Sequence, residues 1–475
     1  MRVSGTKTKC LSQLVSIAEI KAAVQERGLS SVWTAAEEIG SEAVKRLAAD
    51  IQTIDWELYE RQMRALRKVH VTDISRIAAP TLLPASSAQE AGHEQARSAG
   101  EAALRNGEIA VLTVAGGQAS RLGFDGPKGA FPLGAMSGVS LFQMFAGQIR
   151  RLRELYACRL QWIIQTSPSN HEDTKRYFEK RSYFGLGLQT VHFVCQGTMP
   201  ALAPNGDLLL SSPDRLFRNP DGHGGVYRAL KVSGLLPKLR ADGIATLFYC
   251  QVDNPLVWIA DPIFLGHHLL QGARMSVKVV EKTDPSEKVG LVVQEEGGRK
   301  RCVEYSDISA EQQAQRNVDG GLRYCAGNIA IHAFELNFVE EMAEARLPLH
   351  LARKQVMALP KGGMVAEPRE GVKFESFVFD ALPLAETSMV QRADRALEFS
   401  PLKNRLGVDS IATAKHAIAL RNARWIAQAK LQLLPPKGDG PFELESGLCL
   451  SAEDLHSRRK FLTQTCLGRL IKVSR

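Results

Sequence analysis

The sequence predicts an α/β protein with a mixed, mostly parallel sheet, and three observations support that prediction. From residue 109 onward, short apolar runs alternate with segments of helical periodicity, as crossover connections between parallel strands require. The run IAVLTV (109–114) is apolar at nearly every position, which is typical of a strand buried on both faces. The length of 475 residues exceeds what one hydrophobic core usually supports, so two or three domains are expected.

The elements follow one another in a clear order. Residues 1–78 have helical spacing, as in LSQLVSIAEIKAAVQERG, and a connector with two prolines (80–90) leads to a helix within EAGHEQARSAGEAALRNG. After the strand at 109–114 we expect a helix over LFQMFAGQIRRLRELY, a strand in LQWIIQTS, a helix in HEDTKRYFEKR and a strand in TVHFVCQ. In such sheets ligands bind outside the carboxyl ends of the strands, so we expect the ligand-binding residues at the strand ends.

Composition excludes several classes of protein. A hydrophobic content of 44% with 23% charged residues is typical of a soluble globular chain, and no apolar run reaches the roughly 18 residues that cross a bilayer. No unbroken apolar stretch follows MRVSGTKTKC, so no secretory signal is expected. The eight cysteines are scattered and never form Cys-x-x-Cys, which favours reduced thiols and a cytoplasmic location over a zinc site or a disulfide framework.

The formal net charge of +9 leaves the nature of the partner open. An excess of basic residues suits a protein that binds small anionic substrates as well as one that binds nucleic acid. The tail Arg458–Arg475 has six Lys or Arg and no acid, so contact with nucleic acid or a membrane is one interpretation. A solvated helix end is the favoured one, and a nucleic-acid or membrane partner is not expected.

The segment that follows the strand at 109–114 predicts a phosphate-binding loop. Gly116 and Gly117 allow a sharp turn and a close approach to a ligand, and the cations Arg121 and Lys128 follow. The sequence matches neither the Walker loop nor the dinucleotide Gly-x-Gly-x-x-Gly pattern. A simple tight connection is the alternative for this segment taken alone.

Other predicted strand ends also provide polar groups. TVHFVCQG ends in Gln196, whose amide can pair with the edge of a base, and a Gly-rich turn (221–225) opens a helix. ATLFYCQVDNPLV ends in Asp253, a carboxylate with no cation beside it in sequence. Either Asp253 binds Mg²⁺ together with phosphate oxygens, or it caps the turn that follows. Three more polar residues lie beside apolar runs, where each alone is more often a solvated edge residue: Glu304, Asn328 and Lys403.

Taken in order, these segments resemble the eukaryotic-type UDP-sugar pyrophosphorylases. The resemblance spans roughly residues 90–420 and rests on AGGQASRLGFDGPKG, YFGLGLQTVHFVCQG, PDGHGGVYRAL, FYCQVDNPLV, ADPIFLG, KVVEKTDPSEKVG, VEYSDIS, AGNIAIH, GVKFESFVFD and EFSPLKN. It implies a Rossmann-like, GT-A-like nucleotidyltransferase domain at 91–390, after a helical region at 1–90 and before a small C-terminal domain at 391–475. The implied reaction joins UTP and a sugar 1-phosphate into a UDP-sugar and pyrophosphate, with Mg²⁺ or Mn²⁺ as the cofactor.

The resemblance also implies roles for individual residues. Ala115, Gly116 and Gly117 would lie against the uridine, while Gln196 and Gly222 would read the uracil. Asp253 would hold the metal. The catalytic cations at the phosphates would be Arg121, Lys128 and Lys403. The sugar would be received by His223, Gly290, Glu304 and Asn328.

Two departures from the family pattern bear on these implications. The loop has Ala119-Ser120 where the family usually has Gly-Thr, so Ala119 would be strained if that position needs a positive φ. His223 stands where the N-acetylglucosamine branch usually has Asn, whereas enzymes for UDP-glucose or for several UDP-sugars usually have His. VEYSDIS and AGNIAIH match the N-acetylglucosamine branch, so N-acetylglucosamine 1-phosphate is the expected substrate and glucose or galactose 1-phosphate the alternative.

A non-catalytic protein that binds nucleotide sugars is the alternative from a different functional class. Such a binder has no need for several phosphate cations together with a metal-binding carboxylate. The sequence retains all four of these charged residues: Arg121, Lys128, Asp253 and Lys403. An enzyme is therefore the expected function.

Overall fold

The chain forms two compact units. The computed structural model describes residues 16–67, 77–431, 443–465 and 470–473. The first unit combines Met1–Val69 with Thr198–Asp221 and Leu349–Glu375, and the second contains His70–Gly197, Gly222–Pro348 and Ser376–Arg475. This division crosses the predicted boundary near residue 90 and gives two internal segments of the predicted central domain to the first unit.

The first unit contains the N-terminal helices that the sequence predicted, and four of them are α1 (Ile17–Glu26), α2 (Thr34–Ile39), α3 (Ser41–Gln52) and α4 (Trp56–Arg67). Its strands form hairpins: β5 (Thr198–Pro200) pairs with β8 (Arg218–Pro220), β6 (Leu210–Ser212) with β7 (Arg215–Leu216), and β14 (His350–Ala358) with β15 (Glu367–Glu375). Helices and hairpins share one hydrophobic core, which includes Leu47, Leu202 and Phe374. Sequence periodicity could not reveal this partnership, because the segments are far apart in the chain.

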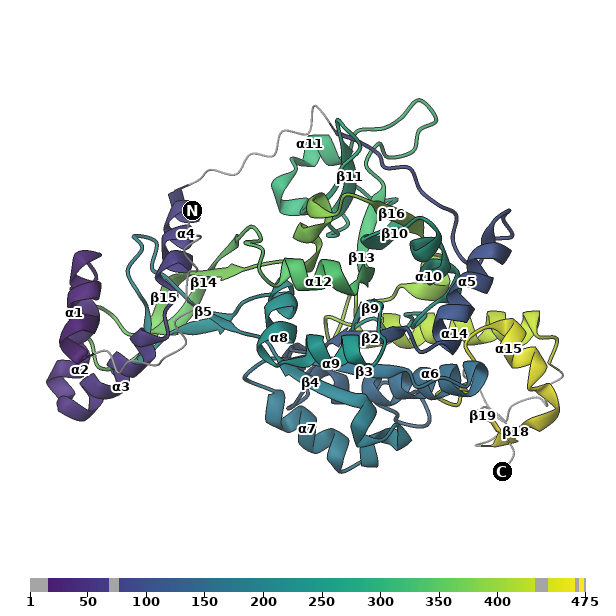
Figure 1. Ribbon diagram of the computed structural model, residues 1–475, viewed down its shortest axis with the longest axis horizontal. Helices are drawn as coiled ribbons and strands as arrows, with labels where there is room; N and C mark the ends of the chain where they lie inside the picture. Colours follow the sequence, from purple (N-terminus) through teal and green to yellow (C-terminus); the bar gives the residue numbers. More distant parts are fainter. Residues whose placement is uncertain (1–15, 68–76, 432–442, 466–469, 474–475) are drawn as a thin grey trace, which may run out of the picture. The chain divides into compact units, whose positions relative to one another are not determined.

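The second unit is built on a ten-stranded mixed sheet (Figure 1). Its longest path runs β1-β11-β13-β9-β2-β3-β4, with β12 beside β11, β10 beside β13 and β16 beside β10. The strands are β1 (Ile77–Ala78), β2 (Ile109–Val114), β3 (Gln161–Thr166), β4 (Val191–Cys195), β9 (Thr246–Gln251), β10 (Met275–Glu281), β11 (Leu291–Glu295), β12 (Lys300–Val303), β13 (Ala326–Glu335) and β16 (Ser388–Arg392).

The parallel half of this sheet confirms the predicted alternation. β9, β2, β3 and β4 are mutually parallel, whereas β13 pairs antiparallel with β9, β10 and β11. The sheet is therefore more evenly mixed than the sequence pattern indicated. The connecting helices of the parallel half fall where they were predicted: α5 (His93–Arg105), α6 (Leu141–Tyr156) and α7 (His171–Glu179).

Helices cover both faces of the sheet, which explains why β2 is apolar along its length. Ile109 and Val111 belong to one core with residues of α5, α6, α7 and α10 (Pro262–Leu270). Ala110 and Leu112 belong to the opposite core, with residues of α8 (Val226–Val232), α9 (Leu235–Ala241) and α12 (Leu336–Met342). Successive side chains of a strand point to opposite faces, so each face of β2 has its own partners.

The C-terminal part of this unit contains α14 (Ile411–Gln428), α15 (Ala452–Ser457) and a small sheet of β17 (Glu443–Leu444), β18 (Leu462–Thr465) and β19 (Leu470–Val473). Figure 1 shows these elements gathered in the yellow region. Arg151 of α6 is paired with Asp454 of α15, its Nε donating to Oδ2 over 3.0 Å. The basic tail was interpreted as a solvated helix end. In its described residues it instead forms a 3₁₀ turn and two strands, so that interpretation was wrong.

None of the helices in the described ranges combines the length and the apolar character that a membrane span requires.

Candidate active site

The predicted nucleotide residues meet at one edge of the sheet. Because β9, β2, β3 and β4 are parallel neighbours, their carboxyl ends lie together and bring Asp253, Ala115 and Gln196 to the same edge. β13 runs antiparallel to β9, with His332 opposite Tyr249. Its amino-terminal end therefore reaches this same edge and brings Asn328 there.

The loop after β2 turns its carbonyl oxygens toward the protein. Asn170 Nδ2 donates to the Ala115 oxygen over 2.8 Å, and Ser167 Oγ donates to the Gly116 oxygen over 2.7 Å. The Lys128 amide donates to the Gly117 oxygen over 3.0 Å. Within the described residues the amides of Gly116 and Gly117 donate to no protein group, so they are available to a ligand oxygen, as the predicted phosphate-binding loop requires.

Gly116 and Gln196 are packed against each other. A Cβ on Gly116 would lie 2.7 Å from the Gln196 Oε1, closer than nonbonded atoms approach. The Gln196 side chain is nearly buried, and its Oε1 accepts a hydrogen bond from Gln165 Nε2 over 3.1 Å. A side chain at position 116 would therefore displace the amide of Gln196, which the hydrogen bond from Gln165 holds beside the loop.

Lys128, Asp253 and the segment before Lys403 form a second group. The Lys128 Nζ lies 3.6 Å from the Asp253 Oδ2 and 3.4 Å from the Leu402 oxygen. The Leu402 amide donates to the Asp253 oxygen over 2.8 Å, and the Ser400 amide donates to the Asn254 Oδ1 over 3.1 Å. Asp253 and Asn254 therefore fix the segment that leads to Lys403. The carboxylate of Asp253 has no cation beside it in the sequence, but in the fold the ammonium group of Lys128 lies next to it.

Lys403 and Arg121 are less closely tied to this group. Lys403 Nζ lies 3.3 Å from Asp409 Oδ2, within a loop that its own backbone closes. Arg121 is exposed on a 3₁₀ turn, and no ion pair joins it to another described residue. Sequence reasoning missed Arg405, whose Nη1 would lie 3.5 Å from a Cβ on Gly123. Arg405 thus adds a cation beside the phosphate-binding loop.

Ala119 is not strained. Its φ is −95° and its ψ is 20°, a turn conformation with negative φ that does not need glycine, and its side chain is buried. Its amide donates to the Gly126 oxygen over 3.0 Å. The strain considered for this position from the sequence is therefore absent.

Replacing Ala119 with glycine should lower the free energy of unfolding by roughly 1–2 kcal/mol, because glycine adds backbone freedom to the unfolded chain and removes a buried methyl group. Urea unfolding of the purified variant measures this. Gly126 is the matched control, because its φ of +138° suits only glycine, so Gly126→Ala should also destabilise the protein. An Ala119→Gly variant more stable than the wild type would contradict this account of the loop.

The Gly-rich turn is built around His223. Gly222 has a φ of +86°, and a Cβ on Gly224 would lie 2.8 Å from backbone atoms of Phe377, so neither position accepts a side chain easily. The His223 ring stacks on Phe377 with centroids 5.0 Å apart and an interplanar angle of 11°. Its Nδ1 accepts the Val378 amide over 3.1 Å. This bond places the ring proton of a neutral His223 on Nε2.

The three other predicted sugar residues surround Cys302. A Cβ on Gly290 would lie 3.0 Å from both the Cys302 Sγ and the Glu304 Oε1. Asn328 Nδ2 lies 3.6 Å from the same sulfur, and the Asn328 amide donates to the Gly290 oxygen over 2.8 Å. Burial first, and the charge of Glu304 next, raise the pKa of the Cys302 thiol well above its usual range, so it stays protonated.

A β-bulge fixes the direction of Asn328. The register of β13 against β10 shifts between Lys278 and Val279, which leaves Ala330 at a φ of +54°. The Ala330 amide donates to the Asn328 Oδ1 over 3.0 Å. Bulges of this kind often direct a side chain at a functional site, and a non-glycine residue at positive φ is a local cost that the surrounding strands must offset.

Comparison with known proteins identifies the family. The model of the family described as UTP–glucose-1-phosphate uridylyltransferase matches residues 49–430. The chain belongs to this family. It is 33% identical to UDP-N-acetylglucosamine diphosphorylase 2 of Arabidopsis thaliana over 86% of this chain and 84% of that protein. It is 36% identical to the UDP-N-acetylglucosamine pyrophosphorylase of Saccharomyces cerevisiae over 69% and 71% of the two chains.

A solved structure extends the likeness to almost the whole chain. The uridine diphosphate N-acetylglucosamine pyrophosphorylase of Trypanosoma brucei, determined in complex with an inhibitor, superposes with a TM-score of 0.79 at 26% identity. The superposition covers 94% of this chain and 95% of that one. The protein is thus a uridylyltransferase with the nucleotidyltransferase-like fold of the UDP-sugar pyrophosphorylases, as the sequence resemblance implied.

In this uridylyltransferase most of the predicted site residues fall into two groups. The loop at 115–117, Gln196, Lys128 and Asp253 form the first, and Gly290, Glu304 and Asn328 form the second. Gly222 and His223 belong to neither group. The turn that contains them packs on the 3₁₀ segment η8 (Val378–Leu384), and η8 also packs on β12, the strand that contains Cys302. Sequence reasoning missed Ser167, Asn170 and Cys302. The polar run TSPSN after β3 could have indicated the first two.

Proposed function

We propose that the protein transfers a uridylyl group from UTP to N-acetylglucosamine 1-phosphate, giving UDP-N-acetylglucosamine and pyrophosphate. The observation that supports this most is the meeting of a phosphate-binding loop, a half-buried carboxylate and a polar cluster at one edge of the sheet. The names of the relatives from plants, yeast and trypanosomes support the choice of sugar.

The proposed roles are those that the sequence resemblance implies, and the grouping of the residues supports them. The uracil lies beside Gln196 and Gly222, and the triphosphate receives the amides of Gly116 and Gly117 together with the cations. A phosphate oxygen of the sugar substrate attacks the α-phosphorus of UTP while the bond to pyrophosphate breaks. No protein nucleophile is needed, because the protein's task is to align two polyanions and to balance their charge. Lys128, Arg121 and Lys403 supply that charge, and Arg405 adds to it.

The residues present fit a divalent cation held mainly by phosphates. Asp253 is half-buried, and no cluster of three or more His, Cys, Asp or Glu side chains that could hold a metal occurs among the described residues. One carboxylate together with phosphate oxygens and water is the usual environment of Mg²⁺. In this proposal Asp253 would hold Mg²⁺ or Mn²⁺, which would supply positive charge to the phosphates. Lys128, beside the same carboxylate, would supply further positive charge to them.

The cytoplasm is the proposed location. None of the six cysteines in the described part of the chain forms a disulfide, as reducing compartments favour.

His223 is the proposed sugar selector. The side-chain oxygen of an asparagine at this position could still accept a hydrogen bond from the Val378 amide. The substitution removes the ring that stacks on Phe377, and the asparagine NH₂ group has two donor hydrogens where the neutral histidine ring has one. His223→Asn should raise the ratio of kcat/KM for N-acetylglucosamine 1-phosphate over glucose 1-phosphate, by roughly tenfold. His416→Asn, at an exposed position on α14, is the control. An equal ratio in the wild type and both variants would remove His223 from this role.

Pyrophosphate release with UTP, Mg²⁺ and a panel of sugar 1-phosphates tests the proposal. We expect the highest kcat/KM with N-acetylglucosamine 1-phosphate, and lower values with the glucose and galactose esters. A preference for glucose 1-phosphate would favour the alternative that His223 suggested. No release with any sugar would overturn the proposed activity.

A further inference from the structure

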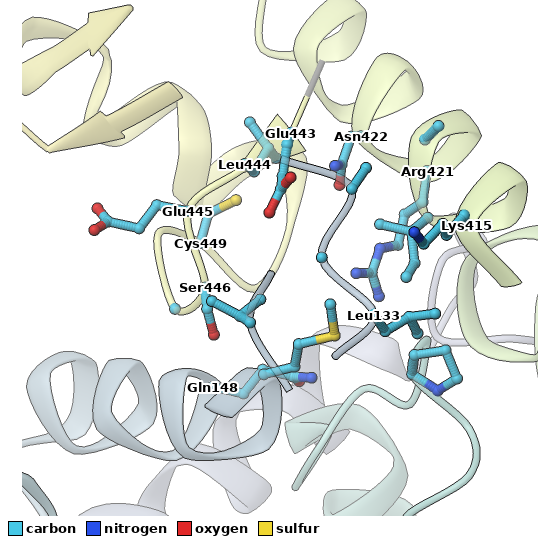
Figure 2. Close-up of a pocket in the computed structure, with 18 of the residues that line it drawn as sticks. Leu133, Gln148, Lys415, Arg421, Asn422, Glu443, Leu444, Glu445, Ser446 and Cys449 are labelled. Atoms are coloured by element: carbon cyan, nitrogen blue, oxygen red, sulfur yellow. The ribbon is translucent and has the colours of Figure 1, made fainter. Parts of the chain in front are cut away.

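A cavity lies outside the two groups of site residues, between the C-terminal elements and the sheet-covering helix α6 (Figure 2). Its volume is about 80 Å³, several times the roughly 10–15 Å³ that one water requires. The walls come from α6, from α14, from the residues after the phosphate-binding loop and from the segment 443–449. Its apolar part includes Leu133, Ile418 and Trp425.

Arg421 of α14 is a cation in this wall without a counter-ion. Its Nη1 donates to the Leu256 oxygen over 3.3 Å, but its Nε is shielded from solvent and has no hydrogen-bond partner. Within the described residues no carboxylate lies in salt-bridge range of Arg421. Burial lowers the pKa of its guanidinium to about 10, so the group is still charged at neutral pH. A partly buried charge with no carboxylate partner is only incompletely compensated by the Leu256 oxygen and by the Trp425 ring, whose centroid lies 4.8 Å from the Arg421 Cζ, so this arrangement favours the binding of an anion.

Two acids line the cavity, Glu443 and Glu445, and the first of them is already engaged in hydrogen bonds. Glu443 Oε2 accepts the amides of Met136 and Ser137 over 2.6 and 3.2 Å, and Oε1 accepts the Ser137 hydroxyl. Glu443 could neutralise Arg421 only by giving up these bonds. Lys415, six residues before Arg421 on the same helix, is a second cation of the cavity wall without an ion pair among the described residues, and Figure 2 shows both on the α14 side.

We propose that this cavity binds a small organic monocarboxylate, with the carboxylate at Arg421 and Lys415 and an apolar body against Ile418 and Trp425. Arginine and lysine both donate charge-assisted hydrogen bonds to a carboxylate. A phosphate dianion fits less well, because most of the remaining wall is apolar and offers few further donors.

The cavity is connected to the proposed active site through the chain. Pro255 in its wall follows Asp253 by two residues, and Arg421 holds the oxygen of the next residue, Leu256. A bound carboxylate that attracts the guanidinium of Arg421 would therefore weaken its hydrogen bond to the Leu256 oxygen, in the segment that follows Asp253. This connection rests on the proposed function, whereas binding itself does not.

Binding can be measured with benzoate as the probe and benzamide as its neutral counterpart. We expect benzoate to raise the midpoint of thermal unfolding of the full chain in a saturable way, and benzamide to have little effect. Arg421→Met should weaken benzoate binding roughly tenfold or more. Arg424→Gln, an arginine of the same helix paired with Asp394, should bind benzoate like the wild type.

Two further variants keep the test decisive. Lys415→Met replaces Arg421→Met in the test if the latter does not fold. We expect Lys415→Met to weaken benzoate binding several-fold, and unchanged benzoate binding by this variant would refute the proposal. Lys128→Met should leave benzoate binding unchanged, and a loss in it would place benzoate at the phosphate-binding loop instead. Equal effects of benzoate and benzamide, or full benzoate binding by a folded Arg421→Met variant, would also overturn the proposal. All of these readouts are independent of turnover, so they distinguish this site from a failure of the proposed activity.

Discussion

Lys128→Ala is expected to lower the rate of pyrophosphate release by roughly 10²–10³-fold while the protein stays folded. Lys128 lies beside both the loop and the metal-binding candidate: its Nζ lies 3.6 Å from the Asp253 Oδ2, and its Cε would lie 4.0 Å from a Cβ on Gly117. Its charge therefore acts where negative charge collects during the transfer. Steady-state kinetics with saturating UTP and sugar 1-phosphate measure this loss.

Lys175→Ala is the matched control for this experiment. Lys175 is a partly exposed lysine of α7 whose ion pair is with its helix neighbour Glu172, 3.5 Å away, so its removal should leave turnover unchanged. Turnover of Lys128→Ala near the wild-type value would show that the lysine is structural and that the catalytic role assigned to it is wrong.

Asp253→Asn is expected to have the second largest effect. Asparagine keeps the size of the side chain but loses the negative charge that would hold Mg²⁺, while the backbone oxygen still accepts the Leu402 amide. We expect turnover to fall by roughly 10²-fold or more, and half-maximal activity to require more Mg²⁺. A titration with Mg²⁺ at fixed UTP measures both quantities.

Asp125→Asn serves as the control, since Asp125 is an exposed carboxylate on the same loop as Lys128. Its dependence on Mg²⁺ should match that of the wild type. The metal role of Asp253 would be refuted if Asp253→Asn also kept the wild-type dependence.

Local patterns predicted the parallel half of the fold because each of its elements is defined by neighbours in sequence. The strand at 109–114 and the helix over 141–156 were expected with the bounds that the structure gives. The antiparallel half depends on long-range pairing, such as that of β13 with β9, which periodicity does not encode. The assignment of 198–221 and 349–375 to the N-terminal unit was out of reach for the same reason.

The candidate site was predicted in composition but not in contacts. The resemblance supplied Gln196 and Asp253, yet only the fold shows Gln196 packed on Gly116 and Lys128 beside Asp253. The concern over Ala119 could not be resolved from sequence, since its φ depends on how the loop closes onto Gly126.

A crystal structure of the protein with UDP-N-acetylglucosamine tests the central claim most directly, namely that the two groups of residues form one nucleotide-sugar site. The account predicts uracil beside Gly116 and Gln196, and the N-acetylglucosamine ring within hydrogen-bond distance of Glu304 and Asn328. A sugar bound away from Glu304 and Asn328, or a uracil bound away from Gly116 and Gln196, would contradict it.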